Sequence, residues 1–204
     1  MTPLAWTSMA TGCNPGKHGI YDFFEIDRTN YDLTTTDFTE MNRSAVWDIF
    51  DAEDIDAGVF NFPVAFPPPK VGSFFISGVP SESSQPITYP PELRQQLEGF
   101  DYEVQPDETA PEGLERYFEA ISDHASTQGE VLKTLIEDND LDHCWAVFMD
   151  IDWAQHYLWD AEIDGENAVD RLYRLIDDIV GELLGVVDDD VTVVVVSDHG
   201  ARPI

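Results

Sequence analysis

Two pairs of aspartate and histidine residues in the second half of the chain are candidates for metal binding. Asp152 and His156 are four residues apart, so a helix would present both on one face. Asp198 and His199 are adjacent, so the turn that carries them must splay their side chains. Carboxylate oxygen and imidazole nitrogen bind divalent ions such as zinc, and two ions about 4 Å apart can use neighbouring ligands. The two pairs therefore predict a two-metal site.

Each pair follows a hydrophobic run that is typical of a buried parallel strand. The runs cover residues 145–149 and 191–196, and a stretch with helical apolar spacing, 167–184, lies between them. Strand, helix and strand in this order form a right-handed crossover, so both strands end at the same edge of the sheet. Either pair alone would also fit a helix-surface pair or a helix cap. Their shared position after predicted strands favours metal ligands.

The chain is also predicted to contain a short helix that begins at Thr2. A threonine hydroxyl caps free backbone amides, Pro3 suits the first helical turn, and Gly12 suits the end of the helix. Further helices are predicted over residues 43–51, 111–122 and 129–138, and strands over 58–61 and 71–78.

Three histidines remain outside the two pairs. His18 follows a turn and is predicted to be structural. His124 and His143 lie among polar residues in the sequence and are predicted to be exposed to solvent. None of the three is therefore proposed as a metal ligand.

The composition is strongly acidic. The 204 residues include 41 Asp and Glu but only 10 Lys and Arg, which gives a formal net charge of -31 at pH 7. The acids are scattered through the chain, which favours a halophilic protein whose self-repulsion is screened by salt. An acidic surface for a basic partner is the alternative, although such partners usually meet blocks of like charge. No basic stripe is present, so a nucleic-acid-binding surface is not expected.

Cysteines and hydropathy narrow the class of protein further. Cys13 and Cys144 are far apart in the sequence and form neither a zinc knuckle nor a disulfide framework. No apolar run approaches the ~18 residues of a membrane span, and no signal peptide is recognisable. We therefore expect a cytoplasmic protein without a membrane partner.

Several motifs together resemble the type I phosphodiesterase/nucleotide pyrophosphatase branch of the alkaline phosphatase superfamily. The segment 2–23, with Trp-Thr-Ser-Met-Ala-Thr-Gly-Cys-Asn-Pro-Gly-Lys-His-Gly-Ile, resembles the region of the nucleophile, and 152–156 and 197–200 resemble the metal motifs. The segments 61–69 and 76–78 are similar to prokaryotic members. The resemblance implies an α/β fold with a largely parallel central sheet flanked by helices. Residues 1–204 would form a partial domain, incomplete at both ends, with a surface insertion around 79–128.

The resemblance also assigns roles to single residues. Thr2 corresponds to the nucleophile, Asp152 and His156 to ligands of one metal ion, and Asp198 and His199 to ligands of the other. The implied activity is metal-dependent hydrolysis of a small-molecule phosphate ester, of the phosphodiesterase or nucleotide pyrophosphatase type. Zinc is the usual metal of the family, and manganese is the alternative. A metal is needed because a threonine hydroxyl is a poor nucleophile at neutral pH.

The chain departs from the family pattern at three places. The family has an aspartate ligand before the nucleophile and a histidine ligand well after Asp-His-Gly, and neither has a counterpart here. We therefore expect a truncated or split gene product whose missing parts are encoded separately or lost. Phe23 stands where nucleotide pyrophosphatases often have an asparagine. Monoester, phosphonate and sulfate ester substrates therefore stay open beside diesters.

Two alternatives accompany this interpretation. The chain could be a catalytically inactive remnant or an acidic binding module that keeps the fold without its metals. Removal of Met1 would instead make Thr2 a free N-terminal nucleophile with its own amine as base. The Pro3 position and the metal motifs favour the metal-dependent hydrolase over this last mechanism.

We expect the fold to require molar salt. Raising the salt concentration from 0.1 M to 1 M shortens the screening length from about 10 Å to about 3 Å, which weakens repulsion among the acids. Far-UV circular dichroism should show a native signal in molar KCl that declines in dilute buffer. An unchanged signal in dilute buffer would contradict the prediction.

Overall fold

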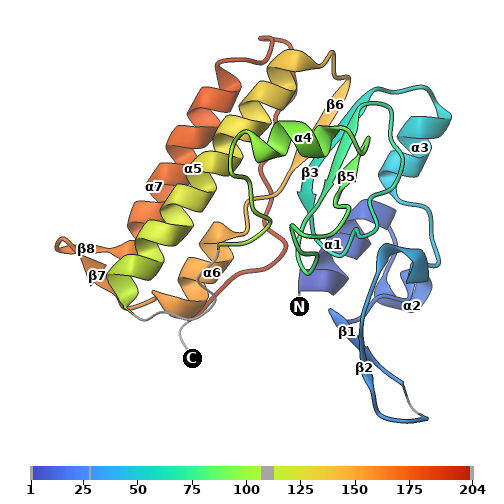
Figure 1. Ribbon diagram of the computed structural model, residues 1–204, viewed down its shortest axis with the longest axis horizontal. Helices are drawn as coiled ribbons and strands as arrows, with labels where there is room; N and C mark the ends of the chain where they lie inside the picture. The colour runs from blue at the N-terminus through green and yellow to red at the C-terminus, as the bar shows by residue number, and fades with distance from the viewer. Residues whose placement is uncertain (1, 28, 107–112, 203–204) are drawn as a thin grey trace. The chain divides into compact units, whose positions relative to one another are not determined.

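The computed structural model describes residues 2–27, 29–106 and 113–202 and consists of two compact units. The first unit contains the residues up to Gln96 together with Asp140–Val147 and Ser197–His199. The second contains Leu97–Asn139, Phe148–Val196 and the residues from Gly200 onward. Figure 1 labels most of the helices and strands of both units.

A four-stranded sheet forms the core of the first unit. Its order is β5-β4-β3-β6, with β3 (Ala57–Phe62) parallel to both β4 (Phe74–Ser77) and β6 (His143–Ala146). The short strand β5 (Thr88–Tyr89) pairs antiparallel with β4. All six residues of β3 are buried, as expected for a strand between two parallel neighbours. The predicted α/β fold with a largely parallel sheet is confirmed.

Helices of the first unit pack on this sheet through aromatic side chains. The predicted N-terminal helix is confirmed as α1 (Thr2–Thr11), and it ends at Gly12, whose φ of 62° suits a glycine. Trp6 of α1 and Trp47 of α3 (Val46–Ala52) both meet Phe62 edge to face, at centroid distances of 5.6 and 4.8 Å. These contacts fix both helices to strand β3.

Four short elements of the first unit lie between α1 and α3 in the sequence. They are α2 (Pro15–His18), the antiparallel hairpin of β1 (Phe24–Ile26) and β2 (Leu33–Thr35), and the 3₁₀ helix η1 (Phe38–Glu40). All residues of both hairpin strands are exposed. Helix α4 (Leu93–Glu98) spans the sequence boundary between the two units.

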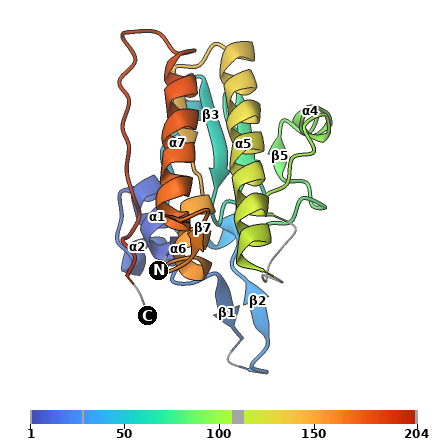
Figure 2. The same ribbon diagram turned by 90° about the vertical axis from the view of Figure 1, so that its left-hand side faces the viewer.

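The main helices of the second unit are α5 (Leu114–Asp138), α6 (Asp150–Tyr157) and α7 (Ala168–Leu184). Each of the three packs against the other two. Figures 1 and 2 show α5 and α7 side by side and running in the same direction. The sequence predicted two helices where the structure has the single 25-residue helix α5. Gly129 lies inside α5, where an added Cβ would come within 2.7 Å of Ile179 Cγ2. This glycine therefore permits close packing of α7 and does not begin the second helix that the sequence predicted.

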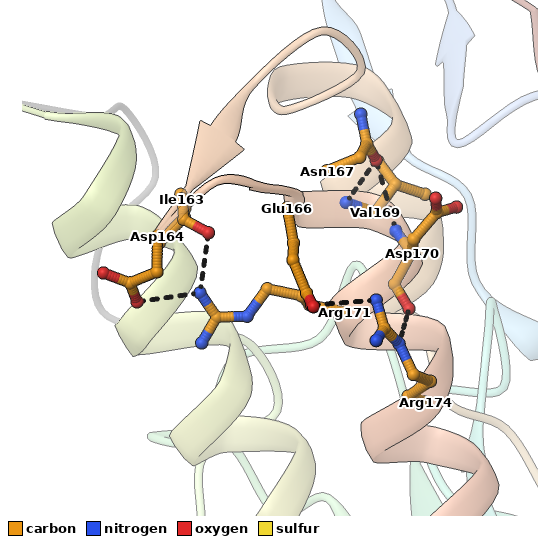
Figure 3. A network of polar contacts seen from close by, with 8 residues as sticks. All are labelled: Ile163, Asp164, Glu166, Asn167, Val169, Asp170, Arg171 and Arg174. Carbon is orange, nitrogen blue, oxygen red and sulfur yellow. Dashed lines mark hydrogen bonds and ion pairs between the residues drawn. The ribbon is translucent and has the colours of Figure 1, made fainter.

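A short hairpin, β7 (Glu162–Ile163) with β8 (Glu166–Asn167), leads into α7, and polar contacts tie the two together (Figure 3). The side chain of Asn167 accepts hydrogen bonds from the backbone amides of Val169 and Asp170, at 3.0 and 3.2 Å. Two arginines of α7 bind back to the hairpin: Arg171 to Asp164 at 3.1 Å and Arg174 to Glu166 at 3.0 Å.

The predicted strand at residues 191–196 is wrong. No strand pairing involves this segment among the residues that the structure describes, and its five valines are between 51% and 83% exposed. A β-strand is stabilised by hydrogen bonds and side-chain packing from a neighbour, and local apolar character cannot replace them. The predicted crossover from residues 145–149 to 191–196 is therefore absent, although β6 and α7 both form.

We expect the substitution Asn167→Ala to lower the free energy of unfolding by about 1 kcal/mol, because two amides at the start of α7 lose their acceptor. Urea denaturation in molar KCl would measure the change. The matched control Asn167→Ser keeps a capping oxygen and should lose less. Equal stability of the alanine variant and the wild type would contradict the role of this cap.

Candidate active site

The first unit brings together three of the residues predicted from the sequence. Thr2, the first residue of α1, is only 7% exposed, and its hydroxyl Oγ1 lies 3.0 Å from Nε2 of His199. The same Nε2 lies 3.4 Å from Oδ2 of Asp198. The fold thus joins residues that are 197 positions apart in the sequence.

Ser197 holds the turn that carries this pair. Its hydroxyl donates to the backbone carbonyl of His199 at 2.5 Å. The side chains of His199 and Asp198 are 24% and 15% exposed, so solvent reaches both. The sequence predicted that the side chains of these adjacent residues would be splayed apart. They are not, because Nε2 of His199 and Oδ2 of Asp198 face each other.

The start of α1 adds a favourable electrostatic setting for an anion. A helix N-terminus presents free backbone amides and a partial positive charge. The first turn of α1 contains no acidic residue, which is notable in a chain with 41 Asp and Glu. The N-terminal charge is therefore not neutralised by the helix itself.

The other predicted pair lies in the second unit, on helix α6. Asp152 and His156 occupy one face of this helix, as the spacing predicted, with Oδ2 and Nε2 3.6 Å apart. The His156 side chain is 59% exposed and that of Asp152 is 24% exposed. Their role as metal ligands stays a prediction.

The donor atoms of both pairs fit a divalent metal ion in type and separation. Two ligands that each bind zinc at about 2.0–2.1 Å in tetrahedral geometry lie roughly 3.3 Å from each other. The observed separations within the pairs are 3.4 and 3.6 Å. Within the described residues, however, no group of three or more His, Cys, Asp or Glu side chains is arranged to hold a metal. Each pair by itself therefore offers two of the three or more protein ligands that a metal site needs, and the role of both pairs as ligands stays a prediction.

His18 has the structural role that was predicted. Its ring is fully buried, and Nδ1 accepts a hydrogen bond from the amide of Ile20 at 3.1 Å. Nε2, which must carry the proton of the neutral ring, donates to Ser8 of α1 at 3.0 Å. Burial lowers the pKa of His18. The residue thus fastens the loop after α2 to the helix that carries Thr2.

The prediction that His124 is a solvent histidine is wrong. This residue is 8% exposed and lies 2.7 Å from the fully buried carboxylate of Asp150. The missed signal is its position in the sequence: His124 falls on the same face of α5 as the buried residues Ile121 and Ala125. His143 is also partly buried, against Phe50 and Trp145, and burial lowers its pKa.

Tyr117 of α5 is buried, and its ring meets that of Tyr157, the last residue of α6, at a centroid distance of 5.3 Å. Burial raises the pKa of its phenol above the ordinary value, and Tyr157, Asp150 and Asp152 raise it further. The phenol therefore stays protonated across the physiological range and adds no charge beside Asp152.

An α/β fold that brings a threonine hydroxyl to an Asp-His pair is suited to metal-dependent ester hydrolysis. Comparison with family models gives a specific match, because the model described as type I phosphodiesterase / nucleotide pyrophosphatase covers residues 1–204. The chain therefore belongs to this family, which confirms the resemblance drawn from its motifs. Members of the family hydrolyse small phosphate esters and are generally metal-dependent. No curated protein and no solved structure matches the chain.

Among the residues that the structure describes, no helix combines the length and the apolar character that a bilayer span requires.

We expect acidification to destabilise the wild type relative to a His18→Gln variant. The pKa of His18 is lowered in the folded protein from its ordinary value of 6.5, so between about pH 7 and pH 5 the unfolded chain takes up a proton that the folded one does not. Urea denaturation of both proteins across this range would test the prediction. Parallel stability profiles for the two proteins would contradict it.

Proposed function

We propose that this chain is a phosphodiesterase or nucleotide pyrophosphatase whose nucleophile is Thr2 and which uses two divalent metal ions. The contact between Thr2 Oγ1 and His199 Nε2, at 3.0 Å, carries the proposal. It joins the residue that family motifs mark as nucleophile to a residue that they mark as metal ligand. Membership of the family supplies the class of substrate.

Thr2 would attack phosphorus in line with the leaving group. Its Oγ1 forms a bond to phosphorus while the bond from phosphorus to the leaving oxygen breaks, which leaves a covalent phosphoryl- or nucleotidyl-threonine. The hydroxyl proton is released as this bond forms, and the leaving oxygen takes up a proton from water. Water then cleaves the intermediate and restores the Thr2 hydroxyl. The amides at the start of α1 would stabilise the negative oxygens on phosphorus.

Asp198 and His199 would hold one metal ion beside Thr2, and Asp152 and His156 would hold the other. A bound divalent ion lowers the pKa of a coordinated hydroxyl and stabilises charge on phosphate oxygens. Zinc fits the combination of imidazole and carboxylate, and manganese is the alternative. The low exposure of Thr2, at 7%, limits the access of bulk water to the nucleophile.

The substrate proposed is a small phosphate diester or a nucleotide pyrophosphate. Phe23 is half-buried and stands where the family often has an asparagine that holds a phosphoryl oxygen. A phenyl ring cannot donate that hydrogen bond, so a monoester, phosphonate or sulfate ester is the competing substrate class. A comparison of ester classes is therefore part of the test.

We expect the substitution Thr2→Ala to reduce hydrolysis by at least about a hundredfold, because the nucleophilic oxygen is removed. Bis-p-nitrophenyl phosphate and p-nitrophenyl phosphate would be assayed in molar KCl with zinc or manganese. The preferred ester of the wild type reports whether diesters or monoesters are the substrate class.

Two controls make the assay specific. Thr2→Ser keeps a hydroxyl and should retain part of the activity, whereas Thr134→Ala removes a hydroxyl from the surface of α5 and should retain all of it. Activity that survives in Thr2→Ala would overturn the role of Thr2. A folded wild type without activity toward either ester would favour the alternative of an inactive remnant or acidic binding module.

A further inference from the structure

A buried histidine-aspartate contact joins α5 to α6 in the second unit. Nδ1 of His124 lies 2.7 Å from Oδ1 of Asp150, and the two side chains are 6% and 0% exposed. A carboxylate only accepts hydrogen bonds, so Nδ1 carries the proton and donates it to Asp150. This contact lies outside the residues assigned to the proposed reaction.

His124 is itself held from several sides. With the proton on Nδ1, its Nε2 accepts a hydrogen bond from Nε2 of Gln128 at 3.1 Å, and the backbone carbonyl oxygen of Glu103 lies beside it at the same distance. Its ring also packs against Trp153 of α6, with a centroid distance of 5.5 Å. Because these contacts fix the ring, its contacts with Asp150 and Trp153 restrain the position of α6.

The contact lies on the side of α6 opposite to the two predicted metal ligands. At roughly 100° per residue, Asp152 and His156 lie about 200° and 240° around the helix from Asp150. Trp153 and Ala154, in contrast, lie within about 60° of Asp150 and contact the neighbouring helices. One face of α6 is therefore anchored, and the other presents Asp152 and His156.

Helix α6 needs such an anchor because it is short. It has eight residues, and its N-cap residue, Met149, makes no side-chain capping hydrogen bond. A helix of this length is marginal without tertiary contacts. Apolar contacts such as that of Ala154 hold the helix against its neighbours. The hydrogen bond between a fixed ring and the first residue of the helix adds a directional constraint on its rotation.

We propose that His124 and Asp150 are positioning residues that orient Asp152 and His156 for metal binding. This inference rests on the proposed function, since it assumes that Asp152 and His156 are ligands. Stability alone does not explain the pair: Asp150 Oδ2 is buried and makes no hydrogen bond within the described structure, which is a cost. Apolar residues of similar volume often replace such pairs without loss of stability.

Cobalt binding in molar KCl would test the proposal on the full chain. The visible absorption of Co²⁺ reports a defined ligand geometry, whereas ions bound loosely to surface acids stay hydrated and absorb weakly. The decisive variant is His124→Phe/Asp150→Leu, which replaces the pair by apolar groups. We expect it to unfold at the same urea concentration as the wild type or a higher one, yet to bind Co²⁺ about tenfold more weakly.

Two single variants separate orientation from folding. Asp150→Asn keeps an oxygen that accepts from Nδ1 of His124, so it should restore binding to within about threefold of the wild type. His124→Phe keeps a ring against Trp153 but removes the donor. Because it leaves the Asp150 carboxylate buried without this donor, it should unfold at a lower urea concentration than the double variant while showing the same loss of binding.

The reference variant Asp152→Asn tests the metal-ligand role of Asp152 separately from the positioning role of His124 and Asp150. If it lowers the number of bound Co²⁺ ions from two to one, while His124→Phe and the double variant keep wild-type affinity and spectrum, the positioning role is overturned and the proposed metal site stands. If Asp152→Asn binds Co²⁺ as the wild type does, the metal role of Asp152 fails, and the positioning role fails with it.

Discussion

The position of Thr2 depends on the aromatic rings around Phe62. Trp6 from α1, Trp47 from α3 and Trp145 from β6 all meet this ring, at centroid distances of 5.6, 4.8 and 5.4 Å. Phe62 is the last residue of the buried strand β3, so three elements are fixed at the carboxyl end of one strand. Each such ring pair contributes roughly 0.5–1.5 kcal/mol beyond its buried area, and together they hold α1 against the sheet.

The extreme acidity of the chain is compatible with this core because the carboxylates stay at the surface. Of the Asp and Glu side chains that the structure describes, Asp150 is the one that is buried. Its hydrogen bond to His124 compensates part of the desolvation cost. The few cations are used locally, as in the contacts of Arg171 and Arg174 with the hairpin before α7. The prediction that the fold requires molar salt rests on the repulsion that remains among these surface carboxylates.

The two Asp-His pairs show why spacing predicts one kind of geometry better than another. Asp152 and His156 share a helix, and the helical repeat alone fixes their separation. Asp198 and His199 lie in a turn, where the separation depends on how the backbone bends and on the contact with Thr2. Residues 191–196 have the composition of a strand but no partner strand, and their valines remain exposed.

The sequence by itself determined the family, the α/β class, the start of α1 at Thr2 and the helical placement of Asp152 and His156. These features depend on local propensity, helical periodicity and short motifs, which are properties of neighbouring residues. Only the tertiary structure decided that Thr2 meets His199, that His124 is buried against Asp150 and that residues 191–196 do not form a strand. These outcomes depend on contacts between residues far apart in the chain. A local pattern can indicate that a position such as His124 lies on a buried face, but it does not identify the residue that it contacts.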